Sequence, residues 1–126
     1  MNRGLNREWV DFVLEVADQL SLSSIWSYSK FDNQTFEERC EAFYWIFERI
    51  LESGRLRLIK NGEYLTGTPK ELVQRFRDVF PTSDIPDPVN WPDEDASFWF
   101  FGDPCPGEAV WRIDHPDDQI EWRHCP

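Results

Sequence analysis

The sequence predicts an α+β fold in which a small antiparallel sheet carries about three helices packed on one face. Two observations carry this prediction. Amphipathic helical patterns occupy residues 7–20, 36–51 and 69–80, and strand-like runs flank an Asn-Gly pair and return near the C-terminus. Because helices and strands do not alternate strictly, parallel βαβ winding is not expected. A length of 126 residues fits a single domain, residues 1–126.

Two helices are predicted in the first half of the chain. Residues 7–20 place apolar side chains three and four positions apart, the spacing of one helix face. That face comprises Trp9, Phe12, Val13, Val16, Ala17 and Leu20. A second helix is expected to follow Thr35, because Glu38 completes a capping box, and to end at Gly54. Its aromatic side chains make it the predicted core helix, while residues 25–33 fit a short helix or an ordered loop.

A hairpin and a third helix come next. Asn-Gly at residues 61–62, between two short alternating runs, is typical of a tight hairpin turn. We expect Arg55, Arg57 and Lys60 on the first run to form one solvated basic face. The third helix, residues 69–80, is predicted from a capping threonine, a first-turn proline and a glutamate that completes the capping box.

The C-terminal third differs in composition from the rest of the chain, because eight of the nine prolines lie in residues 81–126. Residues 81–95 are predicted to form a loop. The apolar run at 97–101 is predicted to be a strand, with residues 108–114 as its partner and residues 119–123 as a last edge strand.

Negative charge is concentrated in the same third. The formal net charge is -11; residues 1–80 hold 11 Lys/Arg and 13 Asp/Glu, whereas residues 81–126 hold 2 and 11. Such a field disfavours nucleic acid and anionic membranes as partners and favours a basic protein. Solubility alone would also account for acidity, but the uneven distribution favours a binding surface.

The number of cysteines indicates the redox compartment of the protein. There are three: Cys40, Cys105 and Cys125. An odd number, with no apolar leader before Trp9, argues against a disulfide scaffold and for a reducing cytoplasm. No segment approaches the ~20 apolar residues of a membrane span. We therefore expect a cytoplasmic protein.

Enzymatic signatures are missing from the sequence, which has no phosphate-binding Gly-rich loop, no Gly-x-Ser-x-Gly elbow and no His-Glu-x-x-His helix. We expect no catalysis and no cofactor. Cys105, His115, His124 and Cys125 are zinc-ligand types, but their spacing does not suit a tetrahedral ion, so no metal site is expected. Carboxylate pairs in a proline-rich loop are expected to be solvated.

The C-terminal third interleaves its carboxylates with tryptophans. Trp is enriched at binding hot spots, and acidic rims select partners. Trp99 and Trp111 fall in predicted strands and are assigned to the core. The predicted partner-binding surface comprises Asp84, Asp87, Trp91, Asp93, Glu94, Asp95, Asp103 and Trp122.

Two segments resemble a known family. They are EAFYWIFERILESGRLRLIKNGEYLTGTPKELVQRFRDVFP, residues 41–81, and FWFFGDPCPGEAVWRI, residues 98–113. An aromatic helix, the runs ESGRLRL and KNGEYL, a short helix ending in Phe-Pro, and a Cys-Pro turn before a Val-Trp strand resemble the bacterial domain-of-unknown-function family 596. The resemblance covers about residues 36–113.

The resemblance implies an immunity function, because genes of this family are associated with large secreted toxins of contact-dependent inhibition and related polymorphic systems. It implies a protein that neutralises the C-terminal domain of a cognate toxin. Many such toxins are basic nucleases, which an acidic inhibitor fits. The resemblance transfers no functional residues. Two alternatives stay open: a small metal-dependent hydrolase, and an adaptor or chaperone for a secreted protein.

Overall fold

The predicted α+β fold class is confirmed. The computed structural model describes residues 7–29, 35–81 and 96–126. These residues form four α-helices, α1 (Arg7–Ala17), α2 (Leu22–Tyr28), α3 (Phe36–Glu52) and α4 (Pro69–Val79), and a short 3-10 helix, η1 (Ala96–Phe101). They also form the strands β1 (Leu56–Lys60), β2 (Glu63–Tyr64), β3 (Glu108–Asp114) and β4 (Ile120–Cys125). The four strands make one antiparallel sheet in the order β2-β1-β3-β4.

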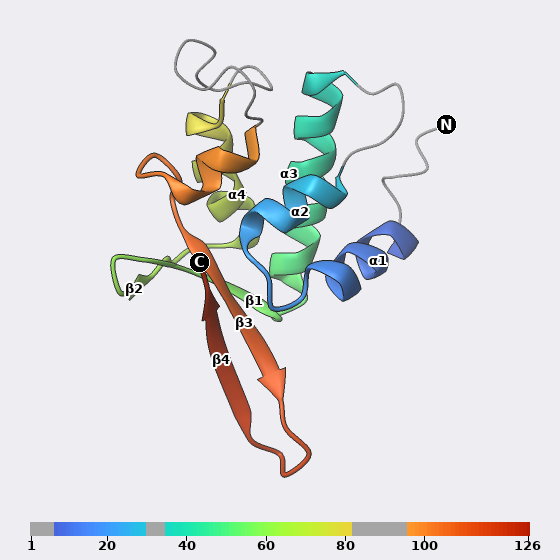
Figure 1. Ribbon diagram of the computed structural model, residues 1–126, viewed down its shortest axis with the longest axis vertical. Helices are drawn as coiled ribbons and strands as arrows, with labels where there is room; N and C mark the ends of the chain where they lie inside the picture. The colour runs from blue at the N-terminus through green and yellow to red at the C-terminus, as the bar shows by residue number, and fades with distance from the viewer. Residues whose placement is uncertain (1–6, 30–34, 82–95) are drawn as a thin grey trace.

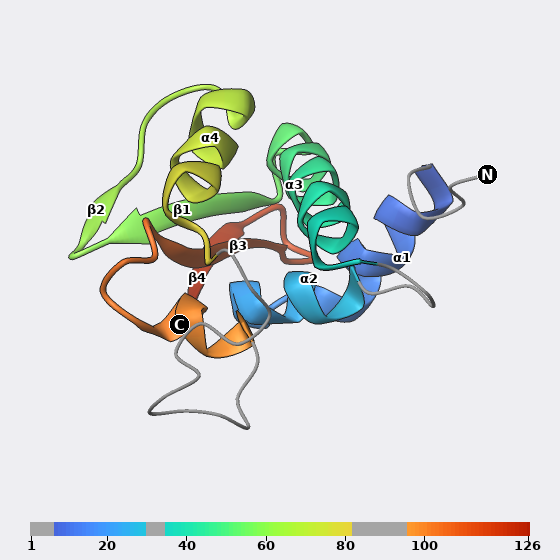
Figure 2. The same ribbon diagram turned by 90° about the horizontal axis from the view of Figure 1, so that it is seen from above.

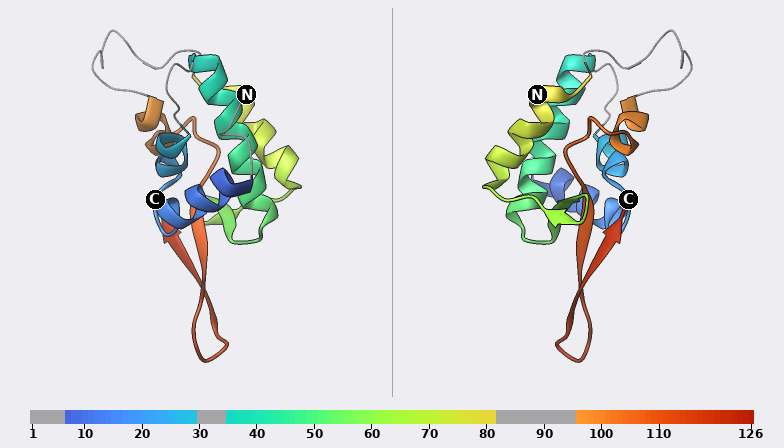
Figure 3. Two further views of the ribbon diagram at one scale, coloured as in Figure 1. Left: turned by 90° about the vertical axis from the view of Figure 1, so that its right-hand side faces the viewer. Right: turned by 90° about the vertical axis from the view of Figure 1, so that its left-hand side faces the viewer.

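The helices gather around one end of the sheet, and the β3–β4 hairpin extends away from them (Figure 1). Helices α3 and α4 pack together on the same side of β1 (Figure 2). Two further views show the tip of the hairpin projecting beyond the helices (Figure 3). Among the described helices, none has the length and apolar character needed to cross a membrane.

Helix α3 is the centre of the core, as predicted. Phe43 and Phe47 on this helix are fully buried. The Phe43 ring contacts the rings of Trp26, Phe80 and Phe100, with centroids 5.6, 5.7 and 5.5 Å away. Aromatic rings bury a large apolar area each and gain further from edge-to-face contacts. Side chains from α2, α4 and η1 therefore meet on α3.

Both predicted capping boxes are present. The Thr35 N–H donates to the Glu38 carboxylate over 2.9 Å, and the Thr68 N–H donates to Glu71 over the same distance. In each box the threonine hydroxyl accepts the glutamate N–H in return. Gly54 follows α3 with a φ of 79°, the left-handed conformation that ends a helix.

The prediction for the first helix is wrong in two respects. The helix ends at Ala17, because Gln19 adopts a left-handed backbone with a φ of 62°. Leu20 therefore leaves the buried face and is 44% exposed. Phe12 is also exposed, since the buried face is centred on Val10 and Val13.

The predicted strand at 97–101 is also wrong, because these residues belong to η1. The rings of Trp99 and Phe100 both contact Phe80 at the end of α4, with centroids 4.9 and 5.8 Å away. A strand would send these two neighbours to opposite faces. A helical turn lets both rings join the same aromatic cluster, and Trp99 is half-buried there.

The remaining strands are confirmed, but residues 108–114 pair with β1 and β4 and not with residues 97–101 as predicted. Strand β4 runs two residues beyond its predicted end. Lys60 pairs with Glu63 across the Asn-Gly turn. The single basic face expected on β1 is wrong. Arg55 forms an ion pair with Asp18 over 3.1 Å, and the Lys60 ammonium donates to the Cys105 carbonyl over 2.8 Å.

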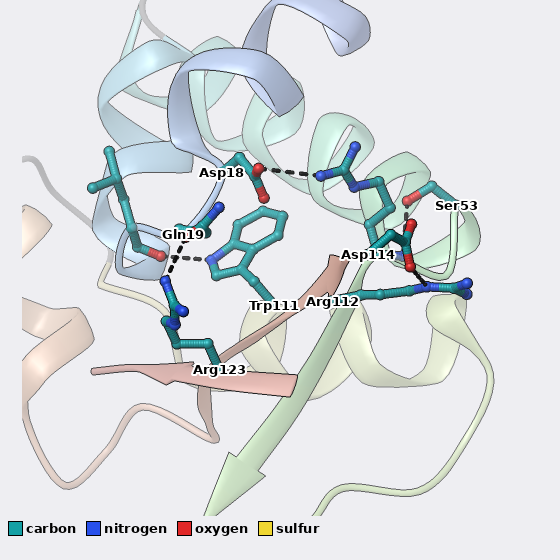
Figure 4. Close-up of polar contacts among 9 residues, drawn as sticks. Asp18, Gln19, Ser53, Trp111, Arg112, Asp114 and Arg123 are labelled. Carbon is teal, nitrogen blue, oxygen red and sulfur yellow. Dashed lines mark hydrogen bonds and ion pairs between the residues drawn. The ribbon is translucent and has the colours of Figure 1, made fainter. Parts of the chain in front are cut away.

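The turn between α1 and α2 holds the β3–β4 hairpin against the helices (Figure 4). Trp111 of β3 is fully buried, as predicted, and its indole N–H donates to the Leu20 carbonyl over 2.7 Å. On β4, Arg123 donates to the Gln19 side chain over 2.8 Å. The left-handed backbone at Gln19 turns these acceptors toward the sheet, so the end of α1 and the orientation of the hairpin are coupled.

Replacing Trp111 by Phe should lower the free energy of unfolding by about 2–4 kcal/mol, because the Leu20 carbonyl loses its donor and the smaller ring leaves a cavity. Urea unfolding followed by circular dichroism measures the change. Trp122→Phe is the control, since Trp122 is only half-buried, and it should cost less than about 1 kcal/mol. Equal losses in the two variants would contradict the role assigned to Trp111.

The capping boxes should make the free energy of unfolding depend on pH in the acidic range. Hydrogen bonds from the Thr35 and Thr68 N–H groups lower the pKa of Glu38 and of Glu71 in the folded protein. Each glutamate therefore stabilises the folded protein fully at pH values above its pKa in the unfolded chain, which is about 4.3. This stabilisation is lost as the pH falls through the lower pKa of the folded protein. The variant Glu38→Gln/Glu71→Gln should therefore show a flatter dependence of unfolding free energy on pH below about pH 5.

Urea unfolding at several pH values between neutral and acid checks this dependence. Glu37→Gln is the matched control, because Glu37 lies in the same first turn of α3 but outside the capping box. The control should keep the slope of the parent chain. A slope in the double variant as steep as that of the control would refute the assignment.

Candidate protein-binding surface

The sheet has an inner face toward the helices and an outer face away from them. Successive side chains of a strand alternate between faces, and Leu56, Leu58, Ala109 and Trp111 point inward, where all four are buried. The residues that alternate with these define the outer face: Arg57, Ile59, Tyr64, Glu108, Val110, Arg112, Trp122 and His124. Val110 is buried on this face, yet it lies outside the core cluster that the helices cover.

Three strands contribute to a stack of side chains on the outer face. The guanidinium carbon of Arg57 lies 3.8 Å from the centre of the Trp122 ring and 5.6 Å from that of Tyr64. Within the described residues Arg57 forms no ion pair, and its guanidinium contacts the faces of both rings. Tyr64 remains 47% exposed. The stack thus presents Arg, Trp and Tyr together to solvent.

A groove of about 440 Å³ opens beside this stack. It lies where β2 ends, and the chain from Leu65 to Pro69 leaves the sheet to begin α4. Its lining residues are Leu51, Gly54, Leu56, Arg57, Leu58, Tyr64, Leu65, Gly67, Pro69, Leu72, Arg112 and Trp122. Leucines therefore form one wall, while aromatic and arginine side chains of the outer face form the other.

Gly107, just before β3, lies close to two leucines that line the groove. A Cβ atom at this position would lie 3.3 Å from the Cβ of Leu58 and 3.4 Å from a methyl group of Leu65. Both leucines line the groove. A residue larger than glycine would therefore require small shifts of these two leucines.

A second groove, of about 230 Å³, runs between α3 and α4, and its charges are already satisfied. Arg77 pairs with Glu41 over 2.6 Å, and Arg49 pairs with Glu48 and Glu52. Because these cations already have partners, this groove offers less to a ligand than the one beside Arg57.

Two of the eight predicted binding residues can be placed. Trp122 lies on the outer face and lines the groove, and its part in partner binding stays a prediction. Asp103 is exposed in the turn before β3, where its carbonyl accepts from Lys60 over 3.2 Å. The two belong to different contact networks. The other six lie outside the described residues: Asp84, Asp87, Trp91, Asp93, Glu94 and Asp95.

Sequence reasoning missed Arg57, Tyr64 and Arg112 as candidate binding residues. The hairpin itself carried a signal for two of them, because the Asn-Gly turn fixes the pairing and so places Arg57 and Tyr64 on one face. No comparable signal joins Arg57 to Trp122, since their contact depends on the pairing of β1 with β3 and of β3 with β4.

The cysteines and histidines near the C-terminus are held in structural contacts. His124 contacts Glu108 over 3.1 Å, whereas Cys125 points to the opposite face, as alternation requires. Burial raises the pKa of the Cys105 thiol to about 11, and the thiol donates to the Gly107 carbonyl. Such a thiol is a poor nucleophile at neutral pH. Within the described ranges no cluster of three or more His, Cys, Asp or Glu could hold a metal ion.

Comparisons with known proteins identify relatives of this chain. A family model described as "Protein of unknown function, DUF596" matches residues 51–123. A solved structure of an uncharacterized protein conserved in bacteria, from Neisseria meningitidis, is 32% identical with a TM-score of 0.74. That match covers 92% of this chain and 88% of the other. No curated protein matches the chain significantly.

The stack on the outer face predicts a measurable coupling between Arg57 and Trp122. In a double-mutant cycle, Arg57→Gln and Trp122→Leu should show a coupling energy of about 0.5–1 kcal/mol in urea unfolding, the range of an exposed cation–π contact. Arg7→Gln combined with Trp122→Leu is the control pair, because Arg7 lies on α1 and pairs with Asp11. Strictly additive effects for Arg57 and Trp122 would show that the stack contributes nothing.

Proposed function

The chain belongs to the DUF596 family of bacterial proteins of unknown function, and we propose that it binds and neutralises a cognate bacterial toxin domain. The observation that carries the binding part is the outer face, where Arg57, Tyr64 and Trp122 gather beside a groove. Trp, Tyr and Arg are the residue types most enriched at binding hot spots. The toxin part is supported by the gene association that the family resemblance implies.

Rigid support suits this surface to a folded partner. Tyr64 and Trp122 have few rotatable bonds, and Arg57 is held against the Trp122 ring. Side chains already held in place lose little conformational entropy on binding, which leaves more of the contact energy as affinity. The hairpin that carries Trp122 is itself fixed to the helices through Trp111.

Acidic residues of the C-terminal third would act at longer range. The predicted carboxylates in residues 84–95 and those near the hairpin tip, Asp114, Asp117 and Asp118, give this third its negative field. Such a field accelerates the encounter with a basic partner and rejects acidic ones, while close contacts determine the dissociation rate. We propose this division of work between the acidic third and the outer face.

Co-expression with the C-terminal domain encoded by the adjacent large secreted-protein gene tests the function. Growth rescue and a stable 1:1 complex are the expected results. Tyr64→Ala and Trp122→Ala should each weaken the complex about tenfold or more. Tyr28→Ala is the matched control, an exposed tyrosine on α2 away from the sheet. A toxic domain that is neither bound nor neutralised by the parent chain would remove the proposal.

Neutralising the acidic residues 93–95 gives a separate test of the electrostatic part. Replacing Asp93, Glu94 and Asp95 together by Asn and Gln should slow association by about tenfold at low salt, with a smaller effect on dissociation. Stopped-flow or surface-binding kinetics at two salt concentrations measure both rates. If association and growth protection are both unchanged, these three acidic residues have no part in recognition.

A further inference from the structure

We propose that the outer edge of β4 pairs with an extended basic segment of a partner protein, which lengthens the sheet beside Trp122. This inference rests on the proposed function in taking the partner to be a basic protein, and it holds whether or not that partner is a toxin. Three features carry it: main-chain groups that point away from the sheet, the exposure of this edge, and the carboxylates at the end of the hairpin.

The direction of the main-chain groups of β4 follows from the hydrogen bonds of β3. The Arg112 N–H donates to the Arg55 carbonyl over 2.8 Å, so the main-chain groups of Arg112 point to β1. Those of its neighbour Trp111 therefore point to β4, where Trp111 pairs with Arg123. In β4 the main-chain groups of Arg123 face β3, and those of Trp122 face away from the sheet. Alternation gives the same outward direction to two more residues of β4: Ile120 and His124.

The described part of the chain leaves this edge exposed. Strand β4 ends the order β2-β1-β3-β4, and among the described elements only β3 packs extensively against it. The tip of the hairpin projects beyond the helices (Figure 1 and Figure 3). Ile120 is 52% exposed there, and Arg123 and His124 are exposed as well. The outward donors and acceptors of β4 are therefore accessible to a further strand.

Carboxylates at the end of the hairpin favour a basic strand. Residues 114–121 contain four carboxylates and no Lys or Arg. Asp114 and Glu121 pair with arginines of the hairpin. Asp117 and Asp118 lie in the turn and form no ion pair with the described residues. A cationic side chain at the end of the bound segment would compensate this charge, whereas an acidic segment would be repelled.

The two faces of a bound strand would meet different side chains. Ile120 and Trp122 lie on the outer face beside the edge, because both alternate with Glu121. Glu121 lies on the opposite face. A strand of alternating apolar and basic residues would place its apolar side chains beside Ile120 and Trp122 and its basic ones beside Glu121. We therefore expect the segment to alternate in this way.

The exposed edge favours a basic peptide over two other occupants. A small polycation would compensate Asp117 and Asp118, but it would leave the outward main-chain groups of β4 unused. A second copy of this chain could offer its own β4 edge, but two chains with a net charge of -11 repel each other. The experiment below distinguishes both.

The test is an NMR titration of the ¹⁵N-labelled full chain with acetyl-Val-Lys-Val-Lys-Val-Lys-amide. The largest shifts should fall on the main-chain amides of Ile120, Trp122 and His124. The peptide with Gln in place of every Lys should bind about tenfold more weakly, since its ion pairs are lost.

Variants of the chain test the role of the turn carboxylates. Asp117→Asn/Asp118→Asn should weaken binding of the Lys peptide about fivefold, the effect of two exposed ion pairs. Asp11→Asn/Asp78→Asn is the matched control, because it removes the same charge from α1 and α4. The control should bind like the parent chain, and an equal loss in both variants would contradict local recognition.

Backbone methylation of the peptide separates strand pairing from simple cation binding. N-methyl groups on one alternate set of residues should abolish binding, and those on the other set should be tolerated, because only one edge of the peptide faces β4. Equal affinity of the two methylated peptides, or of the Lys and Gln peptides, would overturn the proposal. The same shifts with spermine alone, or a dimer by sedimentation with these amides at its interface, would also overturn it.

Co-expression with the toxin domain tests the proposed function independently. Growth rescue without peptide binding at β4 would remove this inference alone. Peptide binding at β4 without rescue would remove the toxin-neutralising function and leave the edge as a binding site for basic segments.

Discussion

The hydrogen bond from the Trp111 indole to the Leu20 carbonyl is the constraint on which the arrangement of sheet and helices depends. It joins a fully buried ring on β3 to the turn between α1 and α2, two parts of the chain separated by 91 positions. Leaving the N–H of the buried Trp111 ring unpaired would cost more than the bond itself contributes, so the turn and the strand must stay together. The position of β4, and with it Trp122 and the outer face, follows from this attachment.

Much of the fold was predictable because its signals are local. The capping boxes at Thr35 and Thr68 and the Asn-Gly turn each specify geometry within a few residues. The helical spacing of α3 and α4 is equally local. The prediction failed at 97–101, where Trp99 and Phe100 form η1 instead of a strand. An apolar run of five residues fits either state, and the contacts with Phe80 that decide between them are long-range.

The candidate site was less predictable, for the same physical reason. Trp122 could be singled out because its surroundings in the sequence are polar. Its partner Arg57 lies 65 positions earlier, and the contact exists only because β3 lies between β1 and β4. Strand order and register depend on the whole hydrophobic core, so a motif search cannot recover them. The missed residues are therefore those on the neighbouring strands, and the acidic positions 84–95 stay a prediction.

Gly107 has a consequence for how such a protein could change its partner. The glycine lies close to the leucine wall, so that even one methyl group would press on Leu58 and Leu65. A substitution there would shift two leucines that line the groove, while substitutions at Arg57 or Arg112 would alter its charge. In the proposed binding surface, the size and the charge of the groove would thus be set from separate positions, and each could diverge without the other in a lineage that keeps the same scaffold.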